Sequence, residues 1–86
     1  MSKEVLTMST QSATTLPLLL IEGELARLAG DTQLRYEENG GAKDIFVNDE
    51  WSARASLFPG MDWELECGGC TYGVIAEEAG LRVEKR

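Results

Sequence analysis

The stretch from Asp62 to Ala76 constrains the fold of this chain most strongly, because two alternating runs meet there at Gly68-Gly69. A Gly-Gly pair between alternating runs predicts a tight hairpin, since a type I′ turn needs positive φ at both central residues. The register that the turn dictates pairs Cys67 with Cys70, Leu65 with Tyr72, and Trp63 with Val74. These six side chains then share one face of the hairpin, which we expect to lie in the core.

The opposite face of the predicted hairpin is acidic. It carries Asp62, Glu64 and Glu66 on the first strand. Their neighbours on the second strand carry no charge. We expect this face to lie in contact with water.

Composition sets the size and the electrostatic character of the protein. The 86 residues suffice for one domain with a modest core, so we expect a single domain over residues 1–86. The chain carries 15 acidic residues, 8 basic residues and no His, which gives a net charge of −7. Such a charge disfavours nucleic acid and anionic membranes as direct ligands, and it favours a partner protein with a basic surface.

Neither a membrane span nor a secretory signal is predicted. The longest apolar run, at residues 18–21, is far shorter than the roughly 20 residues that a spanning helix needs. The N-terminus has a single Lys3 and no long apolar core before a small-residue cleavage site. We therefore expect a cytoplasmic protein with reduced cysteines.

The N-terminal third admits more than one interpretation. Residues 1–15 are rich in Ser and Thr and are predicted to form a flexible arm or an edge strand. Apolar residues then recur at the spacing of one helical face, which predicts a helix over residues 17–29 that ends at Gly30. Because Gly23 in a helix interior costs about 1 kcal/mol relative to Ala, a strand over residues 16–21 that turns at Glu22-Gly23 is the alternative.

A second hairpin is predicted around Asn39-Gly40-Gly41, which joins strands over residues 32–37 and 43–47. Alternation places Leu34 and Tyr36 on one side of the first strand, and Ile45 and Val47 on one side of the second. We expect the two hairpins to share a sheet.

The remaining elements complete an α+β domain. Trp51, Ala55 and Phe58 have the spacing of a helical face, so we expect a short helix over residues 50–58, before Pro59-Gly60. A last strand is expected over residues 81–84. The predicted fold is an antiparallel sheet built from two β-hairpins and a C-terminal strand, with one or two short helices.

Cys67 and Cys70 form a CxxC motif, which is half of a zinc site or the whole of a redox pair. One chain without His supplies only these two thiol ligands to zinc, and the pair flanks a turn instead of starting a helix, where a thiol is activated. We expect no cofactor and no metal in the monomer, with Cys67 and Cys70 as weak metal candidates. We interpret the pair as small apolar groups, although a disulfide between directly opposed residues is geometrically open.

Catalytic equipment is missing from the sequence. There is no His to act as a base near neutral pH, no nucleophile with a base at a recognisable spacing, and no Gly-rich phosphate loop. Paired carboxylates such as Glu64 and Glu66 suit glycosidic chemistry in principle, but so small a chain leaves little room for the pocket. We expect a binding protein that is not an enzyme.

Two acidic clusters are the predicted partner-binding residues. In the first, Asp62, Glu64 and Glu66 alternate along a strand at about 6.6 Å, close to the spacing of successive phosphates. The second cluster consists of Glu37, Glu38, Asp44, Asp49 and Glu50. If both clusters project to one side, they form a patch complementary to a phosphate-binding groove.

In size, charge and lack of catalytic motifs, the chain is similar to small proteins with which phages and mobile elements block host defence. Anti-CRISPR proteins and DNA-mimic anti-restriction proteins belong to this class. The resemblance lies in composition, and it implies a stoichiometric inhibitor, monomeric or homodimeric, that occupies a basic nucleic-acid-binding groove of its partner. The alternative is a structural or assembly protein that self-associates through a sheet edge or through zinc held by CxxC knuckles.

Overall fold

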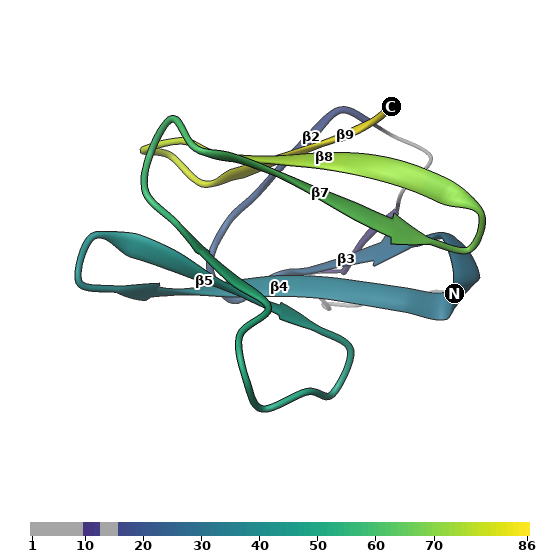
Figure 1. Ribbon diagram of the computed structural model, residues 1–86, viewed down its shortest axis with the longest axis horizontal. Coiled ribbons are helices and arrows are strands. Elements are labelled where there is room, and N and C mark those ends of the chain that lie inside the picture. Colours follow the sequence, from purple (N-terminus) through teal and green to yellow (C-terminus); the bar gives the residue numbers. More distant parts are fainter. Residues whose placement is uncertain (1–9, 13–15) are drawn as a thin grey trace, which may run out of the picture.

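Two β-sheets pack face to face in the computed structural model, which describes residues 10–12 and 16–86 (Figure 1). A short 3-10 turn, Ala29–Asp31, joins β3 (Leu25–Leu28) to β4 (Thr32–Asn39). The five-stranded sheet has the spatial order β1 (Thr10–Ser12), β3 (Leu25–Leu28), β4 (Thr32–Asn39), β5 (Ala42–Val47) and β6 (Ala55–Leu57). The four-stranded sheet has the order β2 (Leu18–Leu20), β9 (Leu81–Lys85), β8 (Cys70–Ala76) and β7 (Asp62–Cys67).

The predicted α+β class is wrong, because the described residues contain strands and one 3-10 turn but no α-helix. The helix predicted over residues 17–29 is replaced by β2 and β3, with a turn between them. Gly23 adopts φ +96° in this turn, and the Glu24 N–H donates to the Ile21 carbonyl at 3.1 Å. The strand that turns at Glu22-Gly23, the alternative left open by the sequence, is the correct interpretation.

The helix predicted over residues 50–58 is also wrong. This segment begins as a projecting loop and ends as β6, which pairs with β5. The Arg54 N–H donates to the Ile45 carbonyl at 2.7 Å, which brings the chain back to the edge of β5. Trp51 is 89% exposed, so the helical spacing of its apolar neighbours does not correspond to a buried face.

Both predicted hairpins are present. In the β7–β8 hairpin, Trp63 lies opposite Val74, Leu65 opposite Tyr72, and Cys67 opposite Cys70, as predicted. Gly68 and Gly69 have φ values of +58° and +78°. The β4–β5 hairpin is longer than predicted, because its strands extend to the two-residue turn Gly40-Gly41.

The hairpins lie in different sheets, so the shared sheet expected from the sequence is not formed. The predicted C-terminal strand is present as β9. Part of the N-terminal region forms the edge strand β1, which runs parallel to β3. Residues 1–9 and 13–15 lie outside the described residues.

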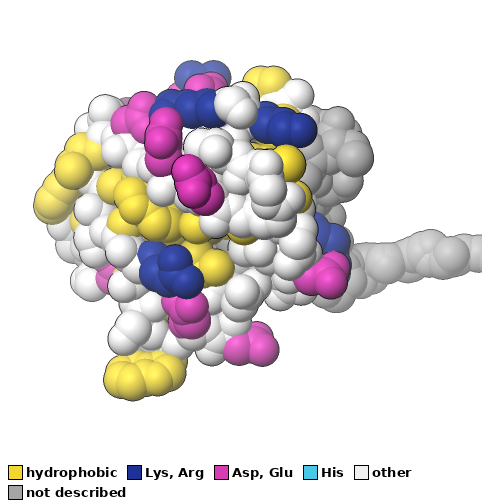
Figure 2. Space-filling model, turned by 45° about the vertical axis from the view of Figure 1, so that its right-hand side comes forward, with side chains coloured by type: hydrophobic (Ala, Val, Ile, Leu, Met, Phe, Trp, Pro, Cys, Tyr) yellow, Lys and Arg dark blue, Asp and Glu magenta, His cyan; other side chains and the backbone are white. Residues whose placement is uncertain are grey.

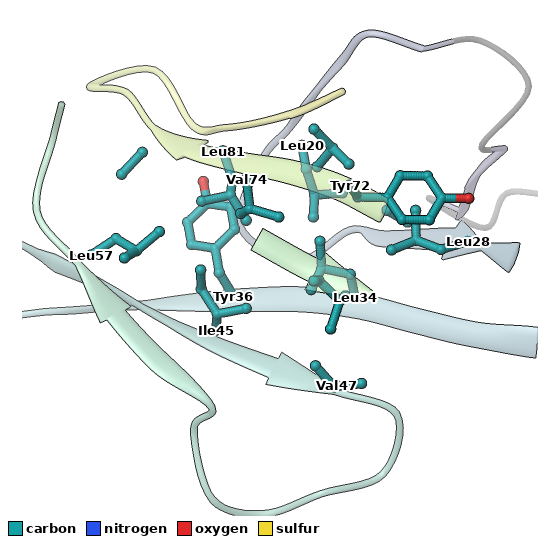
Figure 3. Packing of buried hydrophobic residues seen from close by; sticks show 14 residues of the cluster. Leu20, Leu28, Leu34, Tyr36, Ile45, Val47, Leu57, Tyr72, Val74 and Leu81 are labelled. Carbon is teal, nitrogen blue, oxygen red and sulfur yellow. The ribbon is translucent and has the colours of Figure 1, made fainter. Parts of the chain in front are cut away.

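The core fills the space between the sheets, and both hairpins contribute to it (Figure 3). Leu65, Tyr72 and Val74 are buried as predicted, but Trp63 is only half-buried because β7 lies at the edge of its sheet. Since β4–β5 and β7–β8 bury their inner faces in this one core, their outer faces point in opposite directions. The largest fully buried side chains are Leu20, Leu34, Ile45, Leu81, Val74 and Val83.

The tip of the β7–β8 hairpin joins the two sheets by close packing against the 3-10 turn. A Cβ on Gly68 would overlap with Ala29 and Gly30, so only glycine permits this approach. The Ala29 N–H also donates to the Tyr72 hydroxyl at 3.1 Å. This contact fixes the end of β7 relative to the five-stranded sheet.

Candidate functional site

The two acidic clusters predicted from the sequence belong to different sheets, with Asp49 and Glu50 of the second cluster on the loop after β5. Glu64 projects from the outer face of the four-stranded sheet, because Leu65 beside it is buried. Glu37 projects from the outer face of the five-stranded sheet, because Tyr36 is buried. The structure therefore does not bring the two clusters together in one patch.

The first cluster is partly neutralised by Arg86. Its guanidinium lies 2.8 Å from an Asp62 carboxylate oxygen, 3.3 Å from Glu64 and 3.4 Å from Glu84. Hydrogen bonds to Asp62 contribute most to raising the pKa of Arg86. Figure 2 shows acidic and basic side chains intermixed over the upper part of the molecule, where Figure 1 places the four-stranded sheet. No ion pair involves Glu66 in the part of the chain that the structure describes.

Two members of the second cluster have structural partners within their own sheet. Glu38 forms a 3.0 Å ion pair with Lys43, whose side chain is buried and lies near the Tyr36 ring. Glu37 forms a 2.9 Å ion pair with Arg35. Glu38 therefore offsets a buried charge, whereas Glu37 is more exposed.

The other paired members of the cluster have lowered pKa values. Hydrogen bonds from Ser56 at 2.6 Å and from Asn39 at 2.9 Å hold the pKa of Asp44 below its ordinary value. Glu50 receives two hydrogen bonds from Arg54, at 2.8 and 2.9 Å, and these lower its pKa. These hydrogen bonds fix the positions of both carboxylates and favour their charged forms.

An acidic groove of about 620 Å³ runs between the β2–β3 turn and β4. Arg35 is the one basic side chain among the described residues that line it. Five carboxylates line this groove, those of Glu22, Glu24, Glu37, Glu38 and Asp49.

Glu22 and Glu24 were not predicted as site residues, because both lie within the helix predicted over residues 17–29. As a turn, the same segment places them beside β4, where a Glu22 oxygen accepts a 2.9 Å hydrogen bond from the Glu38 N–H. The Glu24 carboxylate accepts a 3.2 Å hydrogen bond from the Ile21 N–H. The signal that could have revealed both residues is the Glu22-Gly23 pair, which predicts a turn in the alternative interpretation of this segment.

The wall of the groove formed by β4 is held by aromatic contacts. The Arg35 guanidinium lies 4.3 Å from the centre of the Phe46 ring, a cation–π contact that orients this basic group of the lining. Burial raises the pKa of the Tyr36 phenol. Tyr36 is therefore neutral at physiological pH and adds no charge to the groove.

Trp51 lies on the loop between β5 and β6 and was also missed as a site residue. The predicted helix placed it on a buried face, but it is 89% exposed. Figure 2 shows hydrophobic atoms at the end of the projecting loop. The Glu50–Arg54 ion pair closes this loop, and Asn48 ties its start to Gln33 by hydrogen bonds of 2.8 and 2.9 Å. The loop thus presents Trp51 to solvent on an ordered support.

Cys67 and Cys70 are free thiols at the tip of the β7–β8 hairpin. Both are half-buried and pack against the core cluster, as the predicted register requires. Within residues 10–12 and 16–86, no three His, Cys, Asp or Glu side chains are placed to hold a metal ion. Both side chains contribute to packing at the end of the sandwich.

Comparisons with protein-family models, with curated proteins and with solved structures gave no match. A search of the described residues for membrane spans found no helix long and apolar enough to cross a bilayer. The residues that converge on the acidic groove and the Trp51 loop are therefore the candidate site on geometry alone.

Proposed function

We propose that this protein is a non-catalytic binding module whose acidic groove engages a basic surface of a partner protein. The observation that carries this proposal is the convergence of five carboxylates on one groove. Glu37 is paired with Arg35 and Glu38 with Lys43, so the groove keeps a net negative charge. Carboxylates facing Lys and Arg chiefly raise the association rate and select partners by charge. The net charge of −7 acts in the same direction at longer range.

The Trp51 loop supplies the apolar part of the proposed interface. Asp49 lines the groove and lies two residues before Trp51, so the exposed indole stands close to the groove along the chain. Trp is strongly enriched among the residues that dominate binding energy. The Asn48–Gln33 hydrogen bonds and the Glu50–Arg54 ion pair hold the ends of the loop, which lowers the entropic cost of covering Trp51.

In its narrower form, the proposal is that the protein is a stoichiometric inhibitor. The partner surface is then one that ordinarily binds nucleic acid, as for anti-CRISPR and anti-restriction proteins, and the complex forms in the cytoplasm. The net charge of −7 and the five carboxylates of the groove support this form, because a surface that binds phosphates also attracts carboxylates. The partner would be blocked by occupation of its binding surface, without any chemical step.

The experiment that tests this proposal is competition on a purified partner. The partner is captured from host lysate, identified by mass spectrometry and purified, and its nucleic-acid affinity is measured with increasing amounts of the protein. We expect one molecule of protein to displace the nucleic acid from one partner site. Simultaneous binding of protein and nucleic acid would contradict the inhibitor form, and capture unaffected by Glu37→Lys with Asp49→Lys would contradict the groove.

A further inference from the structure

The strand at the edge of the four-stranded sheet, β7, has a row of backbone groups that no other described strand pairs with. It is six residues long, whereas the other edge strands, β1, β2 and β6, have three residues each. Its only strand neighbour among the described residues is β8. Long exposed edges are templates for pairing with another chain.

The register shows which backbone groups face the open edge. Cys67 and Cys70 flank the two-residue turn and exchange both hydrogen bonds, and such pairs alternate along an antiparallel ladder. At the other end, the Ala76 N–H donates to the Met61 carbonyl at 3.0 Å, which confirms this alternation. By this alternation, Trp63, Leu65 and Cys67 direct their N–H and C=O groups toward β8. The other three residues of β7 direct theirs away from β8: Asp62, Glu64 and Glu66.

The same three residues place their carboxylates on the outer face of the sheet. In an added strand, the opposing side chains on that face would lie about 5 Å away. A second copy of β7 would oppose carboxylate to carboxylate, which is unfavourable, whereas Lys or Arg at alternate positions would match the row. Arg86 already contacts Asp62 at 2.8 Å and Glu64 at 3.3 Å from the side of β8, which shows that these carboxylates bind a guanidinium. An added strand would approach them from the other side, where Glu66 has no ion pair among the described residues.

We propose that the β7 edge binds an extended segment of a partner protein in which Lys or Arg recurs at every second position. This segment adds to the sheet as a fifth strand, with main-chain hydrogen bonds supplying affinity and the carboxylates supplying register. The surface is separate from the acidic groove and goes beyond the proposed function. It also provides a physical reason why the protein would not pair with itself through β7.

The test uses a capped peptide of about ten alternating Lys and Thr residues, long enough to cover β7. A matched peptide carries N-methyl groups on the Lys backbone nitrogens, which keeps every charge and removes the N–H groups that would face β7. NMR titration with the first peptide should shift the amide signals of residues 62–67 and slow hydrogen exchange at Asp62, Glu64 and Glu66. The N-methylated peptide should bind at least about tenfold more weakly, because several main-chain hydrogen bonds are lost. Equal affinity of the two peptides, or no change in these amides, would overturn the proposal.

Glu64→Pro and Glu64→Ala provide a test from the side of the protein. Both remove the same carboxylate, but only Pro removes the outward N–H, and an edge strand tolerates Pro where its N–H faces solvent. We expect the Pro variant to bind the Lys–Thr peptide several-fold more weakly than the Ala variant. Equal binding by the two variants would contradict strand addition. If the Pro variant does not fold, the N-methylated peptide on the wild-type protein decides the question.

One further variant separates this proposal from the acidic groove. Glu37→Lys with Asp49→Lys reverses charge in the groove and leaves β7 unchanged, so it should leave the amide shifts in residues 62–67 intact. If this variant alone abolishes peptide binding, the peptide lies in the groove, and strand addition fails while the proposed function stands. The groove proposal is contradicted by a different result: the Glu37→Lys with Asp49→Lys protein still captures the partner.

Discussion

Arg86 places its guanidinium in the space that a side chain on Gly73 would occupy. A Cβ on Gly73 would overlap with the guanidinium carbon and nitrogens. From this position Arg86 reaches Asp62 and Glu64, across β8 from its own strand end. Because Gly73 has no side chain, the Arg86 guanidinium can lie over β8 and contact the carboxylates of β7.

This relationship predicts that Gly73→Ala and Arg86→Gln are not additive. Gly73→Ala should lower the urea midpoint of unfolding, because the new methyl group displaces Arg86 from its carboxylates. In the Arg86→Gln background, the same substitution should have a smaller effect, since the shorter side chain has no guanidinium to displace. Equal effects in the two backgrounds would show that the guanidinium does not occupy this space.

A second prediction concerns the two glycines of the β7–β8 turn. Both have positive φ, so Ala at either position should cost about 1–2 kcal/mol. Only at Gly68 does a Cβ also meet Ala29 and Gly30, which should add about 1–3 kcal/mol. Gly69→Ala is the matched control, because the space around its Cβ is empty. Equal losses in chemical denaturation would contradict the close packing of the turn.

The two Trp residues should respond in opposite ways to substitution. Trp63→Ala should lower the free energy of unfolding by about 2–3 kcal/mol, less than for a fully buried Trp, because Trp63 is half-buried. Trp51→Ala should leave stability within about 0.5 kcal/mol, because the indole is 89% exposed. The same substitution should weaken partner binding by more than about 1 kcal/mol, as measured by calorimetry. Destabilisation by Trp51→Ala would show that the loop is packed.

The pH dependence of Asp44 provides a fourth prediction. Its folded-state pKa lies below the ordinary value of 3.8, mainly because Ser56 donates a hydrogen bond to it. The carboxylate therefore stabilises the fold at pH values above its unfolded pKa, and this contribution is lost as the pH falls through the folded-state pKa. Ser56→Ala should raise the pKa of Asp44 in an NMR titration of the carboxyl carbons. Glu50, paired with Arg54, is the internal control and should titrate as before.

The sequence predicted the hairpins well because their turns are specified locally. Gly68-Gly69 determined the whole register of β7 and β8, down to Cys67 opposite Cys70. Alternation along β7 also correctly placed Asp62, Glu64 and Glu66 on the exposed face. These properties depend on backbone preferences and on alternation, which are encoded within a few residues.

The two predicted helices failed because apolar residues at helical spacing belong to separate strands. Leu18 and Leu28 lie in different sheets, and the turn at Gly23 breaks the apparent period. Trp51 matches the helical pattern of its neighbours but is the exposed end of a loop. The acidic groove escaped prediction for the same reason, since Glu22 meets β4 only after the chain turns. Pairing between distant strands overrides local periodicity in these segments.

The measurement that tests the central claim most directly is the salt dependence of partner affinity for two charge-reversed proteins. Glu37→Lys with Asp49→Lys and Glu64→Lys with Glu66→Lys each raise the net charge from −7 to −3, but on opposite faces. For the wild-type protein, affinity for the purified partner should fall as salt rises and the Debye length shrinks from about 10 Å at 0.1 M to about 3 Å at 1 M. We expect the groove variant, Glu37→Lys with Asp49→Lys, to lose both its affinity for the partner and most of this salt dependence. The β7 variant, Glu64→Lys with Glu66→Lys, should retain binding at the groove. Equal losses in the two variants would show that only net charge matters, and unchanged affinity and salt dependence in the folded groove variant would contradict the acidic groove as the binding site.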